Sequence, residues 1–387
     1  MAFLLALSSA LILYGTMYPF DFTAGAHPGD VLDLLTASLK TRPGRGDTLS
    51  NVVLFLPFGF FAMQSLLLRA PRLLRLICVV ILGAAFSFGI EWAQAYLPLR
   101  VTSVFDLVLN TLGALLGAAA GWPDWRTQLS RLQAGSRPPT LFPVLLLAAW
   151  LGYRLFPYVP TIDFQHVKDA LKPLLSAGLP PLDMLRHLIV TLVVGRMLQA
   201  LTTPGRARLG LVLIAFGVIA AKLFIVTKTI LPAELAGVVA GVALWVFVLS
   251  RWRRHTAIVA ALLALQIAIQ GMTPWSLRAE PAFISFIPFF GFQGGSMSVN
   301  LQSFLEKAFL YGGLVWLLVQ AGRSLAFGLI ASVALLTAVE LVQMFLVNRT
   351  SEITDPLLAL ILGLTMYILD LRDRTKPAEQ GRPRQAI

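Results

Sequence analysis

The sequence predicts an all-α polytopic membrane protein, with about twelve transmembrane helices in three parallel four-helix repeats. Three observations support this fold class. Hydrophobic residues make up 57% of the chain and charged residues only 13%, which is about half the charged share of a soluble globular protein. Twelve apolar runs have the length that crosses a bilayer. A set of five polar residues recurs at a constant spacing within this apolar background.

The twelve runs give the expected helices in order. Each run has roughly 17 to 25 residues, which an α-helix needs to span the hydrocarbon core. The short alternating segments of a membrane β-barrel are absent from the sequence. The first run resembles a signal peptide but has no basic residues before it, so we expect a retained helix. The runs are 2–19, 51–68, 74–97, 104–121, 140–157, 183–201, 209–227, 232–250, 256–272, 300–319, 324–347 and 355–371.

The formal net charge of +12 reflects the placement of basic residues in loops on one side. If the amino terminus is cytoplasmic, 17 of the 31 basic residues fall in cytoplasmic loops and in the carboxyl-terminal tail. The positive-inside rule then places both termini in the cytoplasm. No soluble domain remains to carry a nucleic-acid interface, so the charge indicates topology and lipid contact, with no nucleic-acid partner.

Polar residues inside the apolar segments mark the candidate functional site. Glutamates in such segments are costly in hydrocarbon, so they indicate function by default. The recurring set contains an amide that starts one helix, a glutamate and a glutamine on one helical face, an arginine in the next loop, and an aspartate that starts the next helix. The two copies are Asn51, Glu91, Gln94, Arg100 and Asp106, and, 249 residues later, Asn300, Glu340, Gln343, Arg349 and Asp355.

We expect each set to converge in one ligand-binding pocket at the outer leaflet. The arginine would bind phosphate or carboxylate, the carboxylates would bind an ammonium group, a hydroxyl group or a proton, and the amides would fix orientation. Structural roles remain open for several members. Asp106 follows Ser103 at capping-box spacing, and Asp355 precedes Pro356 as a helix N-cap would.

Further alternatives concern the amide and the arginine of the first copy. Asn51 is either a helix cap or a pocket wall. Arg100 is a ligand group or pairs with Asp106 or Glu91. The two glutamates stand in mid-helix, where the sequence indicates no capping role, so they carry the functional interpretation. After them, Asn110, Gly113 and Gly117 form a stripe of small residues that predicts close helix contact.

A middle copy at an offset of 128 residues is degenerate. Arg100 corresponds to Lys228 and Asp106 to Glu234, whereas the positions of Glu91 and Gln94 hold Ile219 and Lys222. Short amphipathic helices are expected in the loops near 32–40 and 162–175. The predicted organisation is a first unit at 1–128, a degenerate second unit at 129–254, a third unit at 255–371, and a basic disordered cytoplasmic tail at 372–387.

At the motif residues the chain resembles the VanZ-like family. The first copy carries that family's pattern in Asn51 with the following Pro57-Phe58-Gly59, in the Glu91 and Gln94 pair, in Arg100 and Asp106, and in Asn110 with its glycines. The third copy keeps the five polar residues but replaces Pro-Phe-Gly by Glu306-Lys307-Ala308. The resemblance implies a bacterial plasma-membrane protein from a family named for a determinant of low-level teicoplanin resistance.

Three functions follow from these observations. The first is a cell-envelope protein that binds membrane lipids, lipid-linked cell-wall precursors or a glycopeptide at the outer-leaflet pocket. The second is a proton-coupled transporter or lipid flippase that uses Glu91 or Glu340. The third is a lipid-modifying enzyme with Glu91 as general base, ranked last because the sequence shows no nucleophile motif. A single cysteine and dispersed histidines predict no metal site, and no cofactor is expected.

Overall fold

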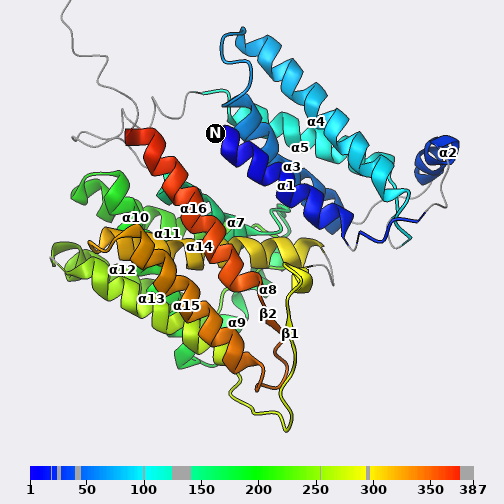
Figure 1. The fold of residues 1–387 in the computed structure, drawn as a ribbon. Coiled ribbons are helices and arrows are strands. Elements are labelled where there is room, and N and C mark those ends of the chain that lie inside the picture. The colour runs from blue at the N-terminus through cyan, green and yellow to red at the C-terminus, as the bar shows by residue number, and fades with distance from the viewer. Residues whose placement is uncertain are drawn as a thin grey trace, which may run out of the picture. The chain divides into compact units, whose positions relative to one another are not determined.

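The computed structural model describes residues 1–18, 20–23, 28–39, 45–98, 101–123, 141–252, 254–292 and 297–374. The described chain is almost entirely helical, which confirms the predicted all-α class (Figure 1). It separates into two compact units, Met1–Leu129 with Phe292–Leu301, and Ser130–Gly291 with Gln302–Ile387. Each unit is described by itself below.

Among its described residues, the amino-terminal part of the first unit contains four long helices and one short helix. Its core joins the first, third and fourth helices through side chains such as Ile12, Phe55 and Ile90, which are at most 2% exposed. The expected short helix in the first long loop is present. The elements are α1 (Ala2–Met17), α2 (Pro28–Ser38), α3 (Arg45–Met63), α4 (Arg72–Gln94) and α5 (Val104–Ala120).

Helices α3 and α5 approach each other closely along the predicted stripe of small residues. A Cβ atom added to Gly113 would lie 2.2 Å from the carbonyl oxygen of Val52, and one added to Gly117 would lie 2.1 Å from that of Leu56. Only residues without a side chain allow backbones to approach in this way. The contact confirms the prediction and places the start of α5 beside α3.

The described residues of the second unit contain the remaining long helices, except that α14 (Met297–Gln320) has its first residues in the first unit. The expected amphipathic helix of its first loop is present as α8. Two residues of β1 pair in parallel with two residues of β2 just before the last helix. The elements are α7 (Leu141–Leu155), α8 (Phe164–Leu171), α9 (Pro173–Ser176), α10 (Pro181–Leu201), α11 (Pro204–Lys222), α12 (Pro232–Phe247), η1 (Leu249–Arg251), α13 (His255–Met272), β1 (Ile284–Ser285), η2 (Phe290–Phe292), α14 (Met297–Gln320), α15 (Leu325–Gln343), β2 (Ser351–Glu352) and α16 (Thr354–Arg374).

A helix occupies each of the twelve predicted apolar runs. By length and composition, six segments within the described residues qualify as membrane spans: α4, α10, α11, Pro232–Arg251, α13 and α15. Five shorter apolar helices lie in α1, α3, α5, α7 and α16. The chain therefore has the helices of a multi-pass membrane protein, and the number of twelve spans stays a prediction.

The predicted ends of three helices, at 97, 227 and 347, are wrong. Helices α4, α11 and α15 end earlier, because the residues that follow each helix bond to an extended segment instead of continuing the helix. In each case a carbonyl two residues beyond the helix accepts a backbone N–H bond. The pairs are Thr23 N with Tyr96 O at 2.8 Å, Thr161 N with Phe224 O at 2.8 Å, and Arg278 N with Phe345 O at 2.9 Å.

An aromatic residue with a positive φ angle stands three positions before each of these N–H donors. Such backbone is unusual for a residue with a side chain and marks a sharp turn. Here 'stretch' means one of the three repeats expected from the sequence. In each stretch the turn follows the first long helix, and the residues after the turn form the backbone bonds given above. The residues are Phe20 with φ 63°, Tyr158 with φ 59° and Trp275 with φ 65°.

Candidate functional site

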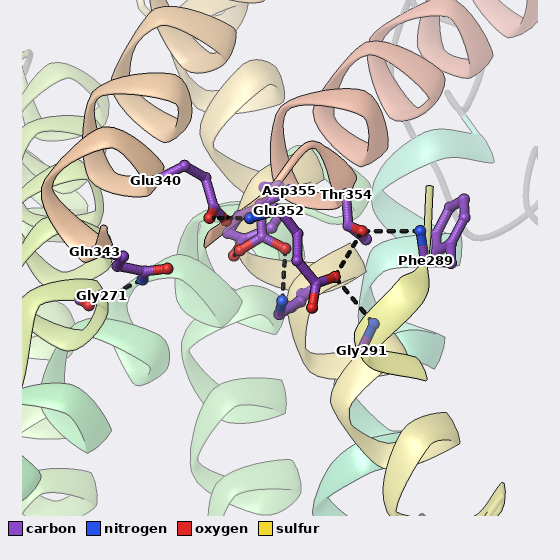
Figure 2. A network of polar contacts seen from close by, with 10 residues as sticks. Gly271, Phe289, Gly291, Glu340, Gln343, Glu352, Thr354 and Asp355 are labelled. Atoms are coloured by element: carbon purple, nitrogen blue, oxygen red, sulfur yellow. Dashed lines mark hydrogen bonds and ion pairs between the residues drawn. The ribbon is translucent and has the colours of Figure 1, made fainter. Parts of the chain in front are cut away.

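The two glutamates of the motif occupy the same local environment. Glu91 is 2% exposed and Glu340 is 6% exposed. The Oε2 atom of Glu91 accepts the backbone N–H of Ser103 at 2.8 Å, and that of Glu340 accepts the N–H of Glu352 at 2.7 Å (Figure 2). Both donors stand twelve residues after the glutamate, just before the next helix begins.

These contacts correct one interpretation of the sequence. The two glutamates lie in the last turn of α4 and of α15, not in mid-helix as expected. Glu91 accepts a hydrogen bond from the backbone of Ser103, the N-cap residue of α5. The glutamates therefore have a structural role in fixing where the following helix starts. Within the described residues, the hydrogen bonds of both glutamate side chains use Oε2 and none uses Oε1.

The glutamines tie the same helix to the first helix of each stretch. The Nε2 atom of Gln94 donates to the carbonyl oxygen of Thr16 at 3.0 Å, and that of Gln343 donates to Gly271 at 2.9 Å. Both glutamines are buried. Because each carbonyl lies in the last turn of a helix, the amide satisfies an acceptor that the helix itself leaves open.

Asp106 and Asn51 are brought together in the first unit. The Nδ2 atom of Asn51 donates to Oδ1 of Asp106 at 2.7 Å, across α3 and α5. The backbone N–H of Asp106 donates to the hydroxyl oxygen of Ser103 at 3.4 Å, which confirms the predicted cap at Ser103. The alternative in which Asn51 caps its helix is wrong, because α3 begins at Arg45.

Asp355 has different partners. Lys307 forms an ion pair with its Oδ1 at 2.5 Å, and the hydroxyl of Tyr311 donates to its Oδ2 at 2.5 Å. Asp355 lies in the first turn of α16, which begins at Thr354, so it is not the N-cap residue that we expected. The sequence analysis missed Lys307 and Tyr311. Their spacing of four on one helix face, with a lysine inside an apolar run, is the signal that could have found them.

The arginine of the third copy binds neither carboxylate. Arg349 donates from Nε to the carbonyl oxygen of Thr273 at 2.8 Å, and from Nη2 to that of Gln270 at 2.8 Å. An arginine on the last carbonyls of a helix is a C-terminal cap, here for α13. Arg100 lies outside the described residues. Asn300 lies inside α14 and is half-buried.

Glu352 is a further carboxylate that the sequence analysis did not single out. Its Oε2 accepts the backbone N–H of Gly291 and the hydroxyl of Thr354, each at 3.0 Å, and the Thr354 hydroxyl oxygen accepts the N–H of Phe289 at 2.8 Å (Figure 2). These bonds hold the aromatic loop before α14 against the start of α16. Only the fold brings these groups together, since they stand about sixty residues apart.

Within each unit, the described polar groups of the motif thus form a frame at the junction between two helices. Carboxylates and amides in this frame mostly bind backbone atoms, so they fix the junction between the helices. Within the described residues, no group of three or more histidine, cysteine, aspartate or glutamate side chains could hold a metal ion. The chemical capacity that remains is the unbonded oxygen of each motif glutamate.

Comparison with known proteins gives one family match, over the amino-terminal part of the chain. The family model described as VanZ/LLP1 matches residues 3–122, a range that holds Asn51, Glu91, Gln94 and Asp106. No curated protein and no solved structure matches the chain. The match covers the stretch in which the sequence carries the complete motif. Residues 3–122 are therefore similar to the VanZ/LLP1 family.

Proposed function

We propose that this VanZ-like membrane protein binds the headgroup of an anionic lipid or a lipid-linked cell-wall precursor at the outer leaflet of a bacterial plasma membrane. One observation carries the proposal. Glu91 and Glu340 are each buried and anchored through Oε2, while Oε1 accepts no bond from the described residues. An anchored carboxylate is a preorganised acceptor for a hydroxyl or ammonium group.

The outer-leaflet assignment rests on charge placement. The loops on the side opposite to the motif hold most of the excess basic residues, so the positive-inside rule directs the motif outward. Both termini then lie in the cytoplasm. A lipid headgroup in the outer leaflet would meet the polar groups of the motif where α4 ends and α5 begins, and likewise where α15 ends and α16 begins.

The proposal includes three tandem units with parallel orientation. Its support is the backbone pairing that follows α4, α11 and α15, together with the aromatic turn residue three positions before each donor. The glutamate and glutamine contacts of the first stretch also return in the third at matching positions. The first and third of these tandem repeats would each hold one ligand site, built among the described residues from Asn51, Glu91, Gln94 and Asp106, and from Glu340, Gln343, Arg349 and Asp355.

A charge-removing substitution tests the ligand role. Glu91→Gln and Glu340→Gln keep the size of the side chain and an acceptor for the backbone N–H, but remove the negative charge. We expect the double variant, at matched membrane levels, to retain less of a purified lipid-linked cell-wall precursor than the wild type does. Glu280→Gln is the matched control, because Glu280 is an exposed loop residue that bonds to no motif group. Precursor retention by the double variant at the wild-type level would refute the proposal.

The resistance role needs a separate measurement. A host that expresses the wild-type protein should tolerate more teicoplanin than one that expresses the double glutamine variant. If the wild type gives no protection while precursor binding depends on the glutamates, the protein is a binding protein without a resistance role.

The same unbonded oxygens support a second candidate, a proton-coupled transporter or flippase. A buried carboxylate that can exchange a proton is the group that coupling requires. In reconstituted vesicles, lipid movement between leaflets should then follow an imposed proton gradient, and Glu340→Gln should uncouple it. Movement that ignores the gradient would exclude this candidate.

A further inference from the structure

The degenerate middle stretch contains a buried cluster of charges that the proposed function does not use. Glu234, in the first turn of α12, is 2% exposed. Its Oε1 forms an ion pair with the guanidinium of Arg154, in the last turn of α7, and its Oε2 pairs with the ammonium of Lys222, at the end of α11. Both carboxylate oxygens are therefore occupied by cations.

A third cation lies near the same carboxylate, so positive charges outnumber negative ones in this cluster. Lys228 is half-buried in the loop between α11 and α12 and lies within electrostatic range of Arg154, Lys222 and Glu234. Burial, together with the nearby Lys222 and Arg154, lowers the pKa of Lys228 from its ordinary 10.5 to about 8. The adjoining Arg186 and Glu306 pair with each other and contribute no net charge. Three cations thus face one carboxylate.

Such an excess is costly in an apolar setting. Buried charges are stable only when they are paired and hydrogen-bonded, and an uncompensated charge within a membrane protein indicates a missing partner. The start of α12 contributes further positive potential through its unbonded N–H groups. An anion with more than one acceptor oxygen would compensate this excess.

The middle stretch carries a charged side chain at the position where the other two carry a glutamine. Gln94 and Gln343 donate to the last turn of the preceding first helix, at Thr16 and Gly271. Lys222 holds the place of these glutamines by sequence offset, and Ile219 replaces the motif glutamate. Arg154 stands four residues before the aromatic turn residue Tyr158, as Thr16 and Gly271 stand before theirs. The middle stretch therefore lacks the motif glutamate and carries a lysine in place of the neutral amide, while it keeps a carboxylate at Glu234.

We propose that Arg154, Lys222 and Lys228, the basic cluster, bind the phosphate group of a phospholipid. The neighbouring surface favours a lipid over a free ion. Helix α8 is tied to the loop that carries Lys228, since Nε2 of His166 lies 2.9 Å from the carbonyl oxygen of Ile225 and the N–H of Ile230 donates to Ala170 at 2.9 Å.

Large apolar side chains around α8 are exposed. Ile162 is 96% exposed, Phe164 is 70% exposed and Leu175 is 95% exposed. An amphipathic helix with such a face lies in the membrane interface, where headgroup phosphates are found. The basic cluster therefore stands next to the surface that would contact acyl chains.

The test uses the full-length protein in detergent micelles and three probes: phosphatidylglycerol, diacylglycerol and inorganic phosphate. Lys222→Gln restores the residue type of the other two stretches, and Lys228→Gln changes a loop residue. Each should weaken phosphatidylglycerol binding by about tenfold, as expected for the loss of one charge-assisted contact. Arg206→Gln, at the opposite end of α11, makes the same charge change away from the cluster and should leave binding unchanged.

The outcomes are distinct. Binding of phosphatidylglycerol but not of diacylglycerol, lost in both lysine variants, supports the phospholipid site. Binding of inorganic phosphate with the same dependence on the lysines and the same strength supports the phosphate site but identifies the free ion as its source. Equal weakening by Arg206→Gln, or wild-type binding by both lysine variants, overturns the proposal. Because Lys228 is in a loop, its variant remains informative if Lys222→Gln does not fold.

Discussion

Replacing Glu91 by alanine is expected to lower the free energy of unfolding because it removes the acceptor of a buried N–H group. The bond from the Ser103 N–H to Oε2 is 2.8 Å long, and Glu91 is 2% exposed, so water does not readily replace the carboxylate. Leaving a buried donor unsatisfied costs about 1–3 kcal/mol. A loss of 2 kcal/mol corresponds to a fall of roughly 4–8 °C in the unfolding temperature of a domain of 150–250 residues.

The matched variant Glu91→Gln separates this bond from the charge. Glutamine retains a carbonyl oxygen in the same place, so its unfolding temperature should stay within a few degrees of the wild type while any function of the charge is lost. The assay is thermal unfolding of the full-length protein in detergent, followed by tryptophan fluorescence. If Glu91→Gln is as unstable as Glu91→Ala, or if neither variant is destabilised, the hydrogen bond to Ser103 does not hold the start of α5.

Three further predictions use the same unfolding assay. Gly113→Ala should destabilise the protein by about 1–3 kcal/mol through overpacking. The control Gly89→Ala has no atom within 4 Å of the added Cβ and should stabilise the protein by about 0.5–1 kcal/mol. Equal effects of the two substitutions would refute the close contact between α3 and α5. Lys307→Met should cost about 1–3 kcal/mol because Asp355 loses its ion pair, and Lys307→Arg should recover most of this loss. Lys228 has a folded pKa of about 8 against an ordinary 10.5, so the unfolded chain binds more protons between these values and stability should rise from pH 8 to 10.5. Lys228→Gln should reduce that rise, because it removes the group whose pKa is lowered; the other charged groups that face this position are Arg154, Lys222 and Glu234.

The helices could be predicted from the sequence because their signal is local. Each apolar run of sufficient length becomes a helix, and the stripe at Gly113 and Gly117 correctly indicated a close helix contact. The helix ends at 97, 227 and 347 could not be predicted in the same way. They depend on backbone bonds to residues more than sixty positions away, and backbone groups leave no trace in residue type.

The candidate site was predictable only in part. The position of Asp106 beside Asn51 followed from placing both at the same end of their helices. The partners of Glu91 and Gln94 are a backbone N–H and a carbonyl, so no side-chain pattern reveals them. Lys307 lies in the segment that departs from the family pattern. Lys307 forms an ion pair with Asp355, the aspartate of the third copy, so this segment provides a cation next to that carboxylate.

The backbone pairing after α4, α11 and α15 has a consequence for divergence among the three stretches. Its bonds join only main-chain atoms, at Tyr96, Phe224 and Phe345. The middle stretch keeps this pairing although it holds Ile219 and Lys222 at the positions that correspond to the glutamate and the glutamine. The pairing therefore does not require those two side chains, and substitutions at their positions should change the local contacts while the backbone bonds remain.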